Sequence, residues 1–501
     1  MTNIKNITIV GGGTSGWMSA AFLAKMTQGK YNIRLVESAS IATIGVGEAT
    51  IPAIKSFNNL LGINEQEFIK ATQGTFKLGI QFCNWGGIGE QYLHGFGPIG
   101  RQWEWLSFYQ YWLKLNAQNK VSALDNFSIN NQIALASRFS PARPDMPKSP
   151  LRDLAYAYQF DAGLYGGFLR RFSEKLGVQR IEGTINQVKT HAENGFIKSL
   201  ILENGEEIAG DLFIDCSGMR ALLIEQTLNT GFEDWSHWLP CDRAIVVPSK
   251  RTEPLLPYTR STAHQAGWQW RIPLQHRTGN GHVYASAFCS DQQAQQTLVQ
   301  NLDAEMLAEP RLIKFATGKR KKAWNRNCIA IGLSAGFLEP LESTSLYLVQ
   351  TAITRLITLF PDRSFKQANI DQYNRQTDFE IERIRDFIIA HYKVNQRNDS
   401  EFWRYCQNMA IPDSLQQKLD VFQAYGRIER QADELFRDES WLQVLVGQNM
   451  LPHSYDPFVD LKSQQELESF VNSTKAVIKS CLANLPSHAD FITQHCLAKS
   501  R

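Results

Sequence analysis

The chain has 501 residues, with 52 Lys and Arg against 49 Asp and Glu, and 43% of its residues are hydrophobic. At about 150 residues per domain this is enough for about three domains, although large single-core enzymes reach the same size. The formal net charge of +3 creates no basic field that would attract nucleic acid. The composition therefore predicts an ordinary soluble globular protein and argues against DNA or RNA binding.

The chain also lacks the usual targeting and membrane signals. Residues 1–10 run into a strand-like segment without the basic region, apolar stretch and cleavage site of a secretory signal. No apolar run approaches the roughly 18 residues of a membrane span. The eight cysteines are scattered and form no CxxC pair, so we expect reduced thiols and no metal site. We expect a cytoplasmic protein that contacts no membrane.

The first 50 residues show a βαβ pattern. Residues 7–10 are predicted as a buried strand, 17–26 as a helix and 33–37 as a second strand. This pattern predicts an α/β fold that starts at the N-terminus.

The middle of the chain mixes loops, helices and strands. Residues 86–150 are aromatic and loop-rich, as expected of a segment that caps or lines a site. A helix is predicted over 168–176, and an Asn204-Gly205 turn predicts a hairpin between strands at 197–202 and 211–214. Residues 240–290 alternate as strands do, and 328–332 form another short buried strand. Beyond residue 341 the periodicity is almost wholly helical.

A glycine motif follows the first strand. Gly11, Gly13 and Gly16 spell G-x-G-x-x-G before the helix, and Glu37 ends the next strand. In such a motif the glycines allow a tight turn, close approach of a pyrophosphate and close helix packing, and the acid accepts from ribose hydroxyls. The helix N-terminus, which includes Thr14 and Ser15, attracts the anion. The sequence therefore predicts one dinucleotide site.

Two other glycine spellings need a different interpretation. Residues 95–100 also spell G-x-G-x-x-G, but they contain Pro98 and open no clear helix, so we expect a loop. Residues 332–336 spell G-x-S-x-G after a strand, which is the pattern of a hydrolase nucleophile elbow. The dinucleotide motif at the start of the fold competes with that hydrolase alternative.

Four further segments, taken with the glycine motif, resemble the flavin-dependent halogenases of the tryptophan halogenase family. They are Trp268-Gln269-Trp270-Arg271-Ile272-Pro273, Phe76-Lys77-Leu78-Gly79-Ile80-Gln81-Phe82, Gly336-Phe337-Leu338-Glu339-Pro340-Leu341-Glu342-Ser343-Thr344-Ser345, and the flavin-strap loop at Ile44-Gly45-Val46-Gly47-Glu48-Ala49-Thr50-Ile51-Pro52. The match covers nearly the whole chain and thins after about residue 400. It implies a Rossmann-type FAD-binding fold of the flavin monooxygenase type, with an additional β-sheet and a helical C-terminal part. We expect an FAD-binding body over 1–360, with the inserted aromatic segment at 86–150, and a helical subdomain over 361–501.

The resemblance implies a role for each matched residue. Lys77 and Glu342 would be catalytic, with Lys77 meeting hypohalous acid and Glu342 polarising the electrophile or taking a proton. Thr344 and Ser345 would contact the halide, and we expect Glu342 to open a helix that holds both in its first turn. The cofactor-binding positions would be Gly11, Gly13, Thr14, Ser15, Gly16, Glu37, Gly45, Val46, Gly47, Glu48, Ala49, Gly332 and Leu333.

Other matched residues lie on the substrate side. His94 and Phe96 match positions that line the aromatic pocket, and Trp268, Trp270, Ile272 and Pro273 match the wall between flavin and substrate. Without the resemblance, each of these residues has a structural explanation. Lys77 could be a surface lysine whose stem packs on apolar side chains while its ammonium stays in water. Glu342 could only complement the helix dipole, and His94 could be a structural histidine. The resemblance favours the functional interpretation of Lys77 and Glu342.

The resemblance predicts a two-component enzyme. Reduced FAD, O2 and chloride or bromide would halogenate an electron-rich aromatic, indole or a substituted indole, by electrophilic substitution through hypohalous acid. With one dinucleotide site, the chain would need a separate NAD(P)H-dependent flavin reductase. The segment 441–452 lacks the paired tyrosines and the acid of tryptophan-specific members. The alternatives are a tryptophan halogenase proper, a flavin-dependent hydroxylase and a flavin-binding module without turnover; a homodimer is one option for assembly.

Overall fold

The computed structural model describes residues 3–39, 47–431 and 433–499. Its contacts divide the chain into two units, each assembled from three separate stretches. The first unit holds residues 1–74, 160–242 and 314–382, and the second holds 75–159, 243–313 and 383–501. The chain thus passes repeatedly from one unit to the other. The domain boundary expected at residue 360 stays a prediction.

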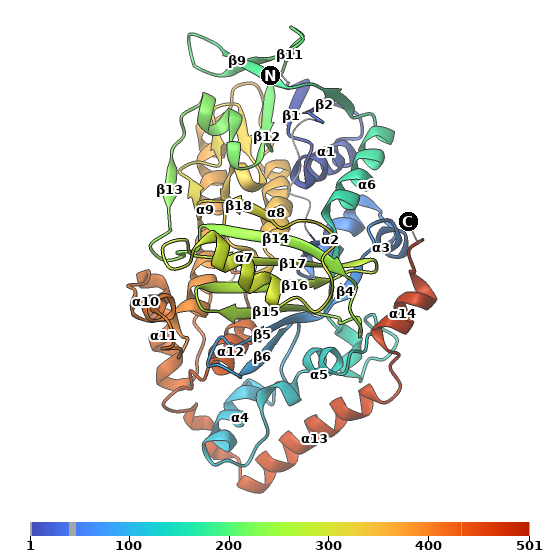
Figure 1. The fold of residues 1–501 in the computed structure, drawn as a ribbon. Coiled ribbons are helices and arrows are strands. Elements are labelled where there is room, and N and C mark those ends of the chain that lie inside the picture. The colour runs from blue at the N-terminus through green and yellow to red at the C-terminus, as the bar shows by residue number, and fades with distance from the viewer. Residues whose placement is uncertain (1–2, 40–46, 432, 500–501) are drawn as a thin grey trace. The chain divides into compact units, whose positions relative to one another are not determined.

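The first unit is built on a six-stranded sheet in the order β20-β21-β12-β1-β2-β8, and the parallel pairs β21-β12, β12-β1, β1-β2 and β2-β8 form most of it. Its strands are β1 (Asn6–Val10), β2 (Asn32–Glu37), β8 (Gln179–Glu182), β12 (Leu212–Asp215), β20 (Trp324–Asn325) and β21 (Cys328–Ala330). Figure 1 shows α1 (Thr14–Thr27) beside β1 and β2. The βαβ prediction for the first 37 residues is therefore confirmed, with the helix starting three residues earlier.

Helices and short sheets complete the first unit. The remaining helices are α2 (Ala53–Leu61), α3 (Glu65–Ala71), α6 (Ala162–Lys175), α8 (Ser345–Thr358) and the first part of α9 (Gln367–Lys393). The small sheets hold β9 (Ile185–Thr190), β10 (Ile197–Leu202) and β11 (Glu207–Ala209), and β13 (Phe232–Asp234), β19 (Gly318–Arg320) and β22 (Gly336–Phe337). Strand β3 (Gly47–Ala49) follows the undescribed residues 40–46.

The hairpin prediction was partly wrong. The Asn204-Gly205 turn joins β10 to β11, which pair antiparallel, and the next strand β12 lies in the six-stranded sheet beside β1. The strand predicted at 211–214 corresponds to β12, and β11 was missed. Because the sheet that a strand joins depends on its long-range partner, local alternation could not show that the turn leads into a separate strand before β12.

The second unit is built on a seven-stranded sheet in the order β18-β14-β17-β16-β15-β5-β6. Its strands are β5 (Gly79–Cys83), β6 (Gln91–Gly95), β14 (Arg243–Lys250), β15 (Thr259–His264), β16 (Gly267–Pro273), β17 (Arg277–Tyr284) and β18 (Arg311–Lys314), and β4 (Thr75–Lys77) pairs with β7 (Ala157–Asp161). Figure 1 shows α7 (Asp291–Gln300) lying across β14 and β17. The strands expected over 240–290 are confirmed.

Seven other helices in the described part of the chain belong to the second unit. They are α4 (Phe108–Ala117), α5 (Ile129–Leu135), α10 (Glu401–Asn408), α11 (Asp413–Tyr425), α12 (Asp438–Gly447), α13 (Gln464–Leu482) and α14 (His488–His495). Helices α5 and α12 contact β6, and α13 contacts α4 and α5. The helical character predicted beyond residue 341 is confirmed. Among the described residues no helix is long and apolar enough to cross a membrane.

Candidate active site

The predicted dinucleotide motif forms a tight turn between β1 and α1. Gly11 has a φ of +114°, and a Cβ there would lie 2.2 Å from the carbonyl oxygen of Cys216. A Cβ at Gly16 would lie 1.9 Å from the carbonyl oxygen of Gly11. At Gly13, by contrast, a Cβ would meet nothing within 4 Å, so the backbone of Gly13 faces open space. Two of the glycines are thus required by packing and the third leaves room for a ligand.

The N-terminus of α1 is suited to an anion. Its cap, Gly13, contributes no side-chain hydrogen bond, and the first turn, which begins with Thr14 and Ser15, contains no acidic residue. The N–H groups of a first helical turn have no partner within the helix, and together with the helix dipole they favour negative charge. The residues present therefore fit the pyrophosphate of a dinucleotide.

Glu37 lies at the end of β2 and against the glycine turn. A Cβ at Gly12 would lie 1.5 Å from Oε2 of Glu37, and the same oxygen accepts a hydrogen bond from Nε1 of Trp17 at 3.3 Å. Nε of Arg180 donates a hydrogen bond to the other oxygen of this carboxylate, Oε1. The structure thus places Glu37 where the motif requires it, while a bond to a ribose stays a prediction.

Gly332 joins a distant segment to the same turn. It has a φ of +79°, and a Cβ there would lie 2.9 Å from Cβ and Oγ of Ser15. Gly332 and Leu333 therefore approach the N-terminus of α1 from more than 300 residues away in the sequence. The two predicted cofactor segments thus lie together in the first unit, and their contact with a cofactor stays a prediction.

Ser334 is not placed as a hydrolase nucleophile. Its side chain is fully buried, and its hydroxyl donates to the backbone carbonyl oxygens of Asp215 and Ile331, the latter at 3.2 Å. A nucleophilic serine needs an exposed hydroxyl and an adjacent base. The structure therefore argues against the hydrolase alternative.

The predicted flavin strap is described only in part. Gly45 and Val46 lie outside the described residues. Gly47, Glu48 and Ala49 form β3, in which Gly47 and Ala49 are buried and Glu48 is half-buried. Their contact with a flavin stays a prediction.

The Glu342 segment differs from its prediction in one respect. Glu342 is fully buried but ends a short 3-10 turn, Pro340–Glu342, and Ser343 follows with a φ of 58°. Helix α8 begins only at Ser345, with Thr344 as its cap, so the prediction that Glu342 opens the helix was wrong. The left-handed Ser343 turns the chain between them, and a break of this kind has no signature in hydrophobic periodicity.

The predicted halide residues do lie at a helix N-terminus. Thr344 is buried and Ser345 is half-buried. Thr344 makes no side-chain capping bond, and the first turn of α8 contains no acidic residue. The first-turn N–H groups of this 14-residue helix are therefore available to an anion.

Lys77 ends strand β4 in the second unit and is fully buried. Its Nζ lies 5.4 Å from the centroid of the Phe96 ring, within the range of a cation–π interaction. Burial excludes the snorkelling surface alternative, because a snorkelling lysine keeps its ammonium in water. A desolvated cation against an aromatic wall is the arrangement that the functional interpretation requires.

His488 supports the Lys77 segment and was not predicted from the sequence. Its Nε2 accepts a hydrogen bond from the backbone N–H of Phe76 at 3.1 Å, and its Nδ1 donates to the carbonyl oxygen of Leu255 at 2.9 Å. Burial lowers the pKa of His488 to about 4, so the ring is neutral at physiological pH. A neutral imidazole with this tautomer ties strand β4 to the last helix of the chain.

An aromatic cluster forms around His94, which is buried. Its place in a substrate pocket stays a prediction. The rings of His94 and Phe387 lie 5.7 Å apart, Phe387 stacks on Phe436 at 3.8 Å, and Trp441 meets Phe387 edge-on at 4.8 Å. Sequence reasoning missed Phe387, Phe436 and Trp441. The nearest signal in the sequence was Trp441, in the segment 441–452 that lacks the paired tyrosines and the acid of tryptophan-specific members.

The backbone that carries His94 and Phe96 is held by an amide side chain. Gln443 of α12 accepts a hydrogen bond from the N–H of Gly95 at 3.0 Å and donates to its carbonyl oxygen at 3.1 Å. A Cβ at Gly95 would lie 1.9 Å from Oδ1 of Asn131. Nδ2 of the same asparagine donates to Oε1 of Gln443. These contacts fix the end of β6 between the two aromatic residues.

The tryptophan pair lies on one face of β16. Alternation places Trp268, Trp270 and Ile272 on the same side of the strand, and the rings of the two tryptophans lie 6.0 Å apart. All three side chains are buried, as is Pro273. Trp270 covers Gly281 so closely that a Cβ there would lie 2.1 Å from the indole. The pair is a rigid wall within the second unit.

Comparisons with known proteins agree with these features. The family model "Tryptophan halogenase" matches residues 6–464. Tryptophan 7-halogenase RebH of Lentzea aerocolonigenes is 33% identical over 98% of both chains. The structure of Xcc4156, a flavin-dependent halogenase from Xanthomonas campestris, is 44% identical and superposes over 100% of both chains with a TM-score of 0.96. That of BrvH, a flavin-dependent halogenase from Brevundimonas sp. BAL3, is 44% identical over 98% of this chain and 99% of the other, with a TM-score of 0.94.

The resemblance suggested by the motifs is thereby confirmed, and so is the expected α/β fold with an FAD-binding part. The glycine turn, the buried lysine and the tryptophan wall all lie in segments that the family model covers. This chain belongs to the tryptophan halogenase family.

Proposed function

We propose that this protein is an FADH2-dependent halogenase that attaches chloride or bromide to an electron-rich aromatic ring, with indole or a simple indole as the substrate. The observation that carries the proposal is the fully buried ammonium of Lys77, 5.4 Å from the Phe96 ring. An ammonium without bulk water around it is a strong hydrogen-bond donor to a small polar oxidant. Family membership supplies the class of reaction.

The cofactor belongs in the first unit, where the open backbone at Gly13 and the uncapped N-terminus of α1 fit a dinucleotide. Bound as FADH2, it supplies two of the four electrons that reduce O2, while the halide supplies the other two and becomes hypohalous acid. Gly332 holds its segment against Ser15, which completes the protein wall at that end of the helix. The Thr344 and Ser345 end of α8 is our proposed position for the halide.

Lys77 holds the hypohalous acid by donating a hydrogen bond to its oxygen, or takes the halogen on its amine; both alternatives stay open. The aromatic carbon attacks the halogen, the bond from halogen to oxygen or nitrogen breaks, and its electron pair leaves with that atom. Glu342, fully buried, accepts the proton that the ring carbon then loses. The wall of Trp268 and Trp270 separates the flavin from the organic substrate, which disfavours direct hydroxylation.

Substrate selection lies in the aromatic cluster of the second unit. The rings of His94, Phe387 and Trp441 pack against one another, and an indole would join the edge of this aromatic cluster. Free tryptophan is the second candidate substrate, because relatives such as RebH are named tryptophan halogenases. A cytoplasmic location, a separate flavin reductase and assembly as a homodimer remain part of the proposal.

Mass spectrometry tests the proposal. The protein is incubated with a flavin reductase, NADH, FAD, O2 and bromide, and with indole or tryptophan in parallel. A bromine isotope doublet on indole supports the proposal, and a doublet on tryptophan alone supports the second substrate. A gain of one oxygen without bromine would overturn halogenation in favour of a hydroxylase.

A further inference from the structure

A polar row of side chains crosses the seven-stranded sheet of the second unit. In the strand register Gln81 pairs with Arg260, Arg260 with Arg271, and Arg271 with Asn280. Residues that pair directly across strands point to the same face, and the next residue along each strand points to the other. Since Trp270 precedes Arg271, this row lies on the sheet face opposite the tryptophan wall.

The two arginines of the row stand directly opposite each other. Like charges in this position repel and destabilise a sheet unless something offsets them. Asp303 reaches both, with its Oδ2 at 3.9 Å from Nη1 of Arg260 and 3.1 Å from Nη1 of Arg271. Among the described residues no other carboxylate forms an ion pair with either arginine. One carboxylate oxygen therefore serves two guanidinium groups, and one positive charge is left over.

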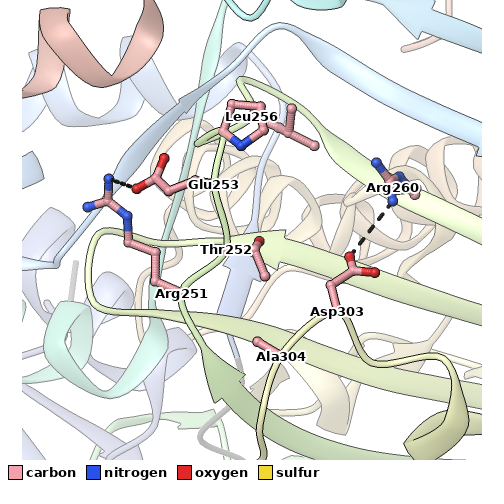
Figure 2. Close-up of a pocket in the computed structure, with 8 residues that line it drawn as sticks. Arg251, Thr252, Glu253, Leu256, Arg260, Asp303 and Ala304 are labelled. Carbon is pink, nitrogen blue, oxygen red and sulfur yellow. Dashed lines mark ion pairs between the residues drawn. The ribbon is translucent and has the colours of Figure 1, made fainter.

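A cavity of about 460 Å³ opens beside Arg260. Figure 2 shows it between the loop after β14, at residues 251–256, and the segment of Asp303 and Ala304. Arg251 on the loop is already paired with Glu253, so the pair adds no net charge. Pro254, Leu256 and Ala304 give the cavity apolar walls, and the surplus charge of the Arg260 pair borders it.

Arg271 lacks an acceptor for one of its donors. Its Nε is buried and has no hydrogen-bond partner among the described residues. Burial lowers the pKa of the Arg271 guanidinium, and Arg260 lowers it further against the opposing effect of Asp303. Its Nη2 donates to the carbonyl oxygen of Asn301. Arg271 does not line the cavity, so its contribution to an anion bound there is its positive charge beside Arg260.

We propose that this cavity binds an oxyanion, the phosphate or carboxylate group of a small acidic molecule. Arg260 is its main contact, because this guanidinium lines the cavity. Its Nε donates to Gln81 and its Nη1 faces Asp303, so the ligand would bind the Nη groups in competition with Asp303. Arg271 adds charge from behind, and Asp303 competes with the ligand for both arginines. The site lies on the sheet face away from Trp268 and Trp270, so it is separate from the proposed chemistry and does not depend on the proposed function.

Isothermal titration of the FAD-loaded protein tests the site, with inorganic phosphate and citrate as probes at constant ionic strength and chloride concentration. We expect at least one probe to bind, Arg260→Gln to weaken binding by about 10-fold or more, and Asp303→Asn to strengthen it, since it removes the competing carboxylate. Arg404→Gln is the matched control, because Arg404 is an exposed arginine of the same unit outside the cavity. Binding of phosphate alone assigns the phosphate class, and binding of citrate alone assigns the carboxylate class.

Two results would overturn the proposal. One is the absence of binding by both probes, and the other is equal binding by wild type and Arg260→Gln. If Arg260→Gln does not fold, Asp303→Asn decides the question, and unchanged or weaker anion binding by that variant rejects the site.

Discussion

The buried His488 makes the stability of the second unit sensitive to acid. Its two ring nitrogens are both used in the neutral form, one accepting from the N–H of Phe76 and the other donating to Leu255. A proton on Nε2 would remove the acceptor and place a charge in a fully buried position. Burial is the main cause that lowers the pKa of His488 from 6.5 to about 4.

The direction of the effect follows from these two pKa values. Above pH 6.5 neither the folded nor the unfolded chain binds the proton, so the neutral ring contributes its full stabilisation. Between pH 6.5 and 4 only the unfolded chain binds it, which favours unfolding. The free energy of unfolding therefore falls as the pH falls, by about 2.5 kcal/mol between pH 7 and 4.5 for a single such group. His282, whose pKa burial also lowers to about 4, contributes a similar loss.

The perturbation is His488→Gln, which cannot titrate. Its side chain satisfies at most one of the two backbone partners at the positions of the ring nitrogens, so we expect it to be about 1 to 3 kcal/mol less stable than wild type at neutral pH. Between pH 7 and 4.5, however, it should lose about 2.5 kcal/mol less than wild type does. Urea unfolding followed by tryptophan fluorescence at several pH values measures both differences.

His453→Gln is the matched control for His488→Gln. His453 is an exposed histidine of the same unit, so its replacement should leave the pH dependence of wild type unchanged. Equal losses of stability by wild type and His488→Gln over this pH range would refute the assignment of His488 as a buried neutral ring.

The remaining predictions concern the proposed chemistry. Lys77→Ala should lower kcat for bromination by about 10²- to 10⁴-fold while FAD affinity, measured by flavin fluorescence, is unchanged; wild-type turnover would reject its catalytic role. Glu342→Gln should lower kcat to a comparable degree. If kcat of this variant and its dependence on pH both equal those of wild type, the carboxylate does not remove the proton. Gly332→Val places side-chain atoms within 3 Å of Ser15 and requires a strained φ, so FAD affinity should drop by about 10-fold or more; an unchanged titration curve would separate this segment from the cofactor. Trp270→Ala should raise the share of oxygenated product or of peroxide released per NADH, as measured by mass spectrometry and a peroxide assay.

Local sequence determined the parts of this protein whose geometry depends on neighbours in the chain. The glycine turn between β1 and α1 was predicted because Gly11 and Gly16 meet packing requirements that no other residue meets, while Gly13 leaves room for a ligand. Alternation along β16 predicted the shared face of Trp268 and Trp270 for the same reason, since a strand sends every second side chain to one side. Motif resemblance then added what single residues leave open, above all that Lys77 is buried.

Tertiary structure decided what depends on residues that are distant in sequence. His488 accepts from the N–H of Phe76, 412 residues away in the sequence, and Gln443 bonds to Gly95, 348 residues away. No local pattern near Lys77 or His94 could therefore predict either partner. Helix α8 starts after Glu342, later than predicted, because Ser343 adopts a left-handed conformation that hydrophobic periodicity does not encode. Only the strand register shows that Arg260 and Arg271 stand opposite each other. The sequence of one strand does not specify its partner strand, since it is compatible with several.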